Sequence, residues 1–197
     1  MSDFKEFIIS DTYESTIEPI QKCFDMNGPE LIYIELNKNS GGNLIPVLEL
    51  IEHLRHAEQK VLLSAKGHIF SAAAVLYFKV LLEKDDSNFR NVSFTKLKEP
   101  LLVLFHSPRN ESGEFIKFPA TKGVVPSNQT PLDIEGQHSI VEAVFHKFLE
   151  KTGNRKISSP PEHEEFSGMK HKSQHILECW NSNFDCIFTW HGADEKS

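Results

Sequence analysis

Three short segments of this chain carry the residue types that acyl-transfer chemistry needs. Ser71 stands at the start of the run "SAAAVLYF", directly after "AKGHIF", while the segment "LLVLFHS" brings His106 to the end of an apolar run. A third segment, the turn "NSGGN" earlier in the chain, holds two adjacent glycines. Serine is a weak nucleophile that needs an adjacent base, and the oxyanion formed in acyl transfer needs preorganised N–H donors. The three segments therefore offer a nucleophile, a base and a backbone able to bind an oxyanion.

The segments that must position these residues alternate between strand and helix patterns. Apolar or β-favouring runs predict strands over residues 6–10, 30–36, 60–65, 100–107 and 184–190. Helical patterns predict helices over residues 16–26, 44–57, 71–84, 140–153 and 172–180, and an irregular segment is expected over 109–128. The first helix would carry Pro19 in its first turn, and the helix over 71–84 is apolar nearly all round, so it should be buried. Strand and helix alternating at this spacing predict an α/β fold, with repeated β-α-β units and a mainly parallel sheet flanked by helices.

In parallel α/β sheets, sites form at the carboxyl ends of strands, and three such ends are expected close together. One strand leads into Ser40-Gly41-Gly42, the next leads through Gly67 to Ser71, and a third ends at His106. A glycine lets the backbone approach a substrate closely, and the N–H of Ala72 falls in the first turn of a helix, where it lacks an intrahelical partner. Gly41 and Ala72 are the expected oxyanion donors.

Each of these signals also has a structural interpretation. Ser71 is equally suited to cap the following helix, the glycine pair to form a plain turn, and His106 to be a hydrogen-bonded structural histidine. Only the order and spacing of the three segments favour catalysis over these alternatives.

That order resembles the family of ClpP, the proteolytic subunit of the Clp protease, whose fold is the wider ClpP/crotonase fold. The resemblance lies in "YIELNKNSGGNLIPVLELIEHL", "VLLSAKGHIFSAAAVLYF" and "LLVLFHSPR", and extends over roughly residues 32–153. It implies that Ser71 is the nucleophile, that His106 is the catalytic histidine, and that the turn over residues 39–42 matches the family's Ser-Pro-Gly-Gly type turn.

The chain departs from the family pattern at several positions. Ser40 replaces the usual proline, Phe70 replaces a small residue, and Ala72 replaces a methionine; the segment between Ser71 and His106 is long, and the glycine-rich strand motif after His106 is missing. The family places an aspartate after its Thr-Gly helix end, whereas "PEHEEFSG" here has none. The resemblance nominates Glu164, then Glu165, as the third triad residue, and a solvated acidic loop is the alternative.

Composition narrows the class of protein. The 197 residues carry a formal net charge of −7, with no basic cluster longer than "KHK", which disfavours nucleic acid as a partner. Three cysteines (Cys23, Cys179 and Cys186) are too few for a disulfide framework, and the acidic N-terminus lacks the pattern of a signal peptide, so a cytoplasmic location is expected. No apolar run approaches the ~20 residues of a membrane span. We expect one domain over residues 1–190 and a disordered tail over residues 191–197.

No metal or cofactor is expected. His171 and His175 are four residues apart, but the chain has no HExxH or CxxC pattern.

The leading functional hypothesis is a ClpP-like serine peptidase that hydrolyses peptides or unfolded proteins. The resemblance implies a homo-oligomer and an AAA+ unfoldase as a possible partner. Two alternatives stay open: a crotonase-type enzyme acting on acyl-CoA thioesters, and a non-catalytic relative that keeps the fold as a scaffold.

Overall fold

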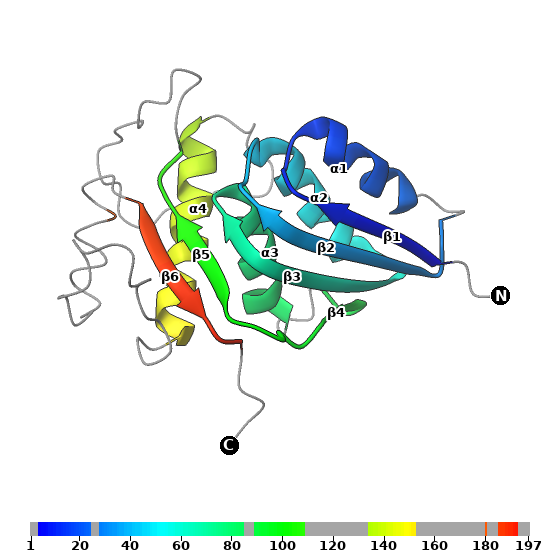
Figure 1. The fold of residues 1–197 in the computed structure, drawn as a ribbon. Coiled ribbons are helices and arrows are strands. Elements are labelled where there is room, and N and C mark those ends of the chain that lie inside the picture. Colours follow the sequence, from blue (N-terminus) through cyan, green and yellow to red (C-terminus); the bar gives the residue numbers. More distant parts are fainter. Residues whose placement is uncertain are drawn as a thin grey trace.

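The computed structural model describes residues 4–24, 28–84, 89–108, 134–152, 180 and 185–192. These residues form an α/β structure in which one sheet carries helices (Figure 1). In chain order the elements are β1 (Phe4–Ile9), α1 (Glu14–Gln21), the 3-10 helix η1 (Lys22–Phe24), β2 (Leu31–Asn39), α2 (Leu44–His56), β3 (Lys60–Phe70), α3 (Ala72–Glu83), β4 (Val92–Phe94), β5 (Leu101–Phe105), α4 (Ile134–Thr152) and β6 (Cys186–Trp190).

The sheet has the strand order β1-β2-β3-β5-β6, and β4 pairs with β3 outside this path. Every pairing is parallel except that of β5 with β6, which is antiparallel. The predicted fold class, a mainly parallel sheet flanked by helices, is therefore confirmed.

The long strand β3 brings the chemistry-bearing segments together. Its first half pairs with β2 and β4, and its last residues pair with β5, with Phe70 opposite Leu104. The carboxyl ends of β2, β3 and β5 therefore meet at one edge, because all three strands run in the same direction. Ser71 follows β3 directly, and its N–H donates to the Leu104 carbonyl at 2.8 Å.

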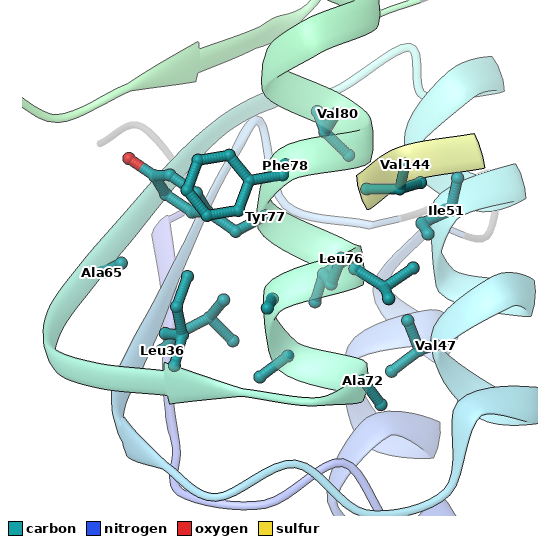
Figure 2. Packing of buried hydrophobic residues seen from close by; sticks show 14 of the residues in the cluster. Leu36, Val47, Ile51, Ala65, Ala72, Leu76, Tyr77, Phe78, Val80 and Val144 are labelled. Carbon is teal, nitrogen blue, oxygen red and sulfur yellow. The ribbon is translucent and has the colours of Figure 1, made fainter. Parts of the chain in front are cut away.

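Helix α3 is the centre of the hydrophobic core, as its all-round apolar sequence predicts. Its residues from Ala72 to Phe78 are all buried. Figure 2 shows α3 between strand residues such as Leu36 and Ala65 on one side and Val47 of α2 on the other. Small alanines in its first turn let the helix lie close to the sheet, since bulkier side chains would hold the two elements apart.

A cluster of aromatic side chains joins α3, α4, β5 and β6. The ring of Phe148 on α4 lies 4.6 Å from that of Phe78, 5.2 Å from that of Phe105 and 5.3 Å from that of Phe188, measured between centroids. Phe148 thus connects the part of the sheet that carries His106 to the helix that begins after Ser71.

Several element boundaries differ from those predicted. Helix α1 begins at Glu14, so Pro19 lies inside the helix and not in its first turn. Strands β2 and β3 continue to Asn39 and Phe70, and α4 begins at Ile134, six residues before its predicted start. Strand β4 had no sequence signal that we recognised, because it is only three residues long.

Other predictions fall outside the described residues. These are the irregular segment over 109–128, all of the helix over 172–180 except Trp180, and the tail from residue 193 onward. Among the described helices, none combines the length and the apolar character needed to cross a membrane.

Candidate functional site

A cavity of about 330 Å³ lies at the edge where β2, β3 and β5 end. It is lined by the glycine turn, the start of α2, the β3–α3 turn, the end of β5 and the first half of α4. The lining residues are Ser40, Gly42, Asn43, Leu44, Ser71, Ala72, Phe105, His106, Pro108, Gln137 and Val141. The structure therefore brings Ser71, Ala72 and His106 together around one cavity.

Ser71 occupies a strained backbone conformation at the turn from β3 into α3. Its φ is 53° and its ψ is −122°, and only Lys38 and Ser71 have positive φ among the described non-glycine residues. Such a conformation costs on the order of 1–3 kcal/mol and is concentrated at functional sites. A serine held on a sharp strand-to-helix turn is the arrangement that exposes a nucleophile in hydrolases of α/β fold.

Helix capping does not explain Ser71. Its side chain makes no capping hydrogen bond in the described structure, although the residue stands at the N-cap position of α3. Backbone hydrogen bonds anchor the turn: the Ser71 N–H donates to the Leu104 carbonyl, and the Ser71 carbonyl accepts from the N–H of Val75.

Gly41 lies against the Ser71 turn so closely that only glycine fits. A Cβ atom added at Gly41 would lie 2.7 Å from the Phe70 carbonyl oxygen and 2.8 Å from Ser71 Cβ. The residue also has a φ of 88°, which L side chains rarely adopt. The glycine turn and the serine turn are thus packed directly on one another.

The Gly41 N–H, however, is not placed as an oxyanion donor. It donates to Asn39 Oδ1 at 2.8 Å, so the expected role conflicts with the observed hydrogen bond. Gly42, not Gly41, lines the cavity. No acceptor for the N–H of Gly42 or of Ala72 is found among the described residues, so this pair is the better candidate for an oxyanion hole.

His106 follows the last residue of β5, and its ring Nδ1 lies 2.6 Å from the Ser107 carbonyl oxygen. A carbonyl only accepts hydrogen bonds, so this contact is a hydrogen bond in the tautomer that carries the proton on Nδ1. Within the described residues, no hydrogen bond joins Ser71 Oγ to the His106 ring. A serine and a histidine that act together in catalysis are expected at about 2.6–3.2 Å, whereas these two side chains line one cavity without that hydrogen bond.

Sequence reasoning missed the contribution of α4. Gln137 and Val141 line the cavity from this helix, but the apolar periodicity that identifies α4 begins only at residue 140. The side-chain amide of Gln137 brings donor and acceptor groups that could bind a substrate backbone. Asn43 was also missed; its side chain accepts from the N–H of Ile45 and so caps α2 beside the glycine turn.

The remaining candidates lie outside the described residues. These are Glu164 and Glu165, nominated as the triad acid, and the pair His171 and His175. Within the described part of the chain, no group of three or more histidine, cysteine, aspartate or glutamate side chains is arranged to hold a metal ion.

No protein-family model and no curated protein matches this chain. Among solved structures, a mutant of ClpP1 from Listeria monocytogenes aligns with a TM-score of 0.45 and 13% identity, over 92% of this chain and 81% of that one. The ClpP protease catalytic domain from Plasmodium falciparum aligns with a TM-score of 0.41 and 10% identity, over 95% and 76% of the two chains. The chain is thus an α/β protein with a likeness to solved ClpP structures, and TM-scores below 0.5 leave the chemistry of Ser71 and His106 to be judged on their own geometry.

Proposed function

We propose that this chain is a serine hydrolase of the ClpP type that cleaves peptides or unfolded proteins, with Ser71 as nucleophile and His106 as general base. The observation that carries the proposal is the strained, uncapped conformation of Ser71 in the same cavity as His106. A fold gains nothing structural from a serine at φ 53°, since glycine would occupy that position at lower cost.

The proposed reaction follows from the groups around the cavity. Ser71 Oγ attacks the scissile carbonyl while Nε2 of His106 accepts the hydroxyl proton. The N–H groups of Gly42 and Ala72 stabilise the oxyanion, and His106 then returns the proton to the leaving amine. A water molecule, deprotonated by the same nitrogen, hydrolyses the acyl-enzyme and restores Ser71.

This reaction requires the His106 ring to move toward Ser71. The two side chains form no hydrogen bond among the described residues, and hydrogen bonds between catalytic groups are often long without substrate and tighten when it binds. Assembly into a homo-oligomer and cooperation with an AAA+ unfoldase form part of the proposal and rest on the sequence resemblance alone. A cytoplasmic location is also part of the proposal and rests on the few cysteines and the N-terminal sequence.

Hydrolysis of a chromogenic peptide ester tests the proposal, because such a substrate needs no unfolding. We expect Ser71→Ala to abolish turnover and His106→Gln to lower kcat by about 10²–10⁴-fold. The matched controls are Ser93→Ala on the exposed side of β4 and His56→Gln at the exposed end of α2, which should retain full activity. Unchanged hydrolysis in Ser71→Ala would refute the proposal.

A non-catalytic scaffold is the second candidate, and the absent hydrogen bond between Ser71 and His106 is the observation that favours it. A scaffold would show no ester hydrolysis above that of the Ser71→Ala variant, at any protein concentration. Binding of an acyl-CoA with no ester hydrolysis would instead support a crotonase-type enzyme.

A further inference from the structure

We propose that the backbone carbonyl of Ser107, held in place by Pro108, positions the His106 ring and fixes its tautomer. In a serine–histidine–acid triad this role belongs to a carboxylate. The inference rests on the proposed function, because a tautomer matters for catalysis only where His106 acts as the base.

The geometry of the histidine carries the first step. His106 Nδ1 lies 2.6 Å from the Ser107 carbonyl oxygen, a short hydrogen bond. Each ring nitrogen of a neutral histidine either holds the one proton or accepts, and the bond made by one nitrogen decides the state of the other. With the proton on Nδ1 directed at the Ser107 carbonyl, Nε2 is the basic nitrogen that a nucleophilic serine requires.

The sequence around the carbonyl carries the second step. Ser107 is buried, with 2% of its surface exposed, and it links the end of β5 to Pro108. A residue that precedes proline is restricted to extended backbone conformations, because the proline ring clashes with it in the helical region. The Ser107 carbonyl belongs to the peptide bond with Pro108, so this restriction sets the direction in which the carbonyl points.

The chemistry of a neutral acceptor distinguishes this arrangement from a triad. A carbonyl fixes the tautomer and orientation of the ring as a carboxylate does, but it carries no charge to stabilise the imidazolium that forms during catalysis. The single Nδ1 proton is engaged by Ser107, whereas the sequence resemblance assigned this proton to Glu164. The two accounts differ in which group the proton faces.

Nitrogen-15 NMR of the full chain labelled on histidine reports the tautomer directly, whether or not the protein is active. The His106 signals are assigned by their loss in His106→Gln. We expect a protonated Nδ1 and an unprotonated Nε2 at a pH above the titration of the ring. A proton on Nε2 would overturn the inference.

Pro108→Ala tests the role of the proline. We expect a mixture of tautomers in the His106 signals and a fall in kcat of roughly tenfold, since a misplaced catalytic group costs rate. Pro100→Ala, at an exposed position just before β5, is the matched control. It should keep a single His106 tautomer and an unchanged kcat. Unaltered signals and an unaltered kcat in Pro108→Ala would show that the proline does not hold the carbonyl.

The same enzyme assay separates this inference from the proposed function. A fall in kcat of a hundredfold or more in Glu164→Gln, with the fold intact, would assign the positioning to a carboxylate and overturn the inference while the hydrolase proposal stands. Absence of serine-dependent hydrolysis in the unmodified chain would refute the proposed function, and the NMR signals would still decide which nitrogen Ser107 engages.

Discussion

At the scale of single residues, Ser71 and Gly41 depend on each other. Ser71 adopts a φ of 53° at the end of β3, and Gly41 packs against this turn with no room for a Cβ atom. Asn39 fixes Gly41 in turn by accepting its N–H. Ser71 is therefore held in place by a neighbouring loop as well as by its own strand and helix.

Gly41→Ala tests this dependence. The added methyl group meets the Phe70 carbonyl oxygen and Ser71 Cβ, and the positive φ by itself costs an L residue roughly 1–2 kcal/mol. We expect a drop in unfolding free energy above that cost, together with a large loss of ester hydrolysis, measured by denaturant unfolding and initial rates.

Gly192→Ala is the matched control for this variant. Gly192 has a similar φ of 92°, but its nearest neighbour to an added Cβ is Leu97 Cδ1 at 3.8 Å, an ordinary contact. Gly192→Ala should lower the unfolding free energy by the cost of the positive φ alone and should keep full ester hydrolysis. Equal effects of the two substitutions would contradict the close packing of Gly41 on the serine turn.

The sequence predicted Ser71, Ala72 and His106 around one site because each follows or ends a readable strand. It did not predict which glycine lines the cavity. Gly41 and Gly42 are equivalent in a sequence pattern, and the choice between them depends on the Asn39 side chain, whose hydrogen bond to Gly41 exists only in the folded structure. The close contact between His106 and Ser107 is equally invisible, because it depends on a side-chain rotamer.

At the scale of elements, the end of β2 is fixed by one buried polar side chain. Asn39 is fully buried; its Nδ2 donates to the Ile9 carbonyl on β1 at 3.2 Å, and its Oδ1 accepts from Gly41. The same strand end contains a register shift between residues 37 and 39 and a positive φ at Lys38. Asn39 thus links β1, β2 and the glycine turn.

Asn39→Ala should destabilise the protein through the groups that it leaves unsatisfied. The Ile9 carbonyl and the Gly41 N–H each lose their partner, and a buried unsatisfied group costs about 1–3 kcal/mol. Asn37→Ala is the control, since Asn37 is only partly buried and bonds Glu35 on its own strand. Equal unfolding free energies for the two variants would argue against a linking role for Asn39.

His68 on β3 predicts a dependence of stability on pH. Burial lowers the pKa of His68 below its usual value of 6.5, and the nearby positive charge of Lys38 lowers it further. Between the lowered pKa and 6.5 the unfolded chain binds more protons than the folded chain, so stability falls as the pH falls through this window.

Thermal unfolding at a series of pH values checks this prediction. His68→Gln should lose less stability than the unmodified chain between pH 6.5 and pH 5, because the substituted side chain cannot be protonated. His56→Gln, at an exposed position, should follow the unmodified chain. If the dependence of stability on pH is the same in His68→Gln as in the unmodified chain, His68 is not the source of that dependence.

At the scale of the whole molecule, the aromatic cluster around Phe148 connects α4 to the sheet and to α3. Helix α4 supplies Gln137 and Val141 to the cavity, so the position of this helix shapes the site. Phe148 is fully buried and contacts aromatic residues from three other elements.

Phe148→Ala should lower the unfolding free energy by about 3–5 kcal/mol, the usual cost of removing a buried aromatic ring. Tyr13→Ala, which removes an exposed ring before α1, should cost much less. Chemical denaturation of both variants measures the difference, and similar losses would contradict the central position of the cluster.

The overall architecture was readable because alternating strands and helices imply parallel pairing with crossovers. Helix α2 was predicted almost to the residue, since its apolar spacing is regular. The start of α4 was not predicted, because the segment "IEGQHS" lacks apolar periodicity. The position at which α4 begins depends on contacts with distant elements. The antiparallel direction of β6 also depends on long-range pairing, which no local pattern encodes.

The central claim is that Ser71 is an activated nucleophile, and covalent labelling with a fluorophosphonate tests it most directly. The hydroxyl oxygen forms a bond to phosphorus and fluoride leaves, so intact mass and peptide mapping locate the adduct. We expect one adduct per chain on Ser71, lost in Ser71→Ala and formed far more slowly in His106→Gln. An unlabelled chain, or an adduct on another residue, would contradict the account.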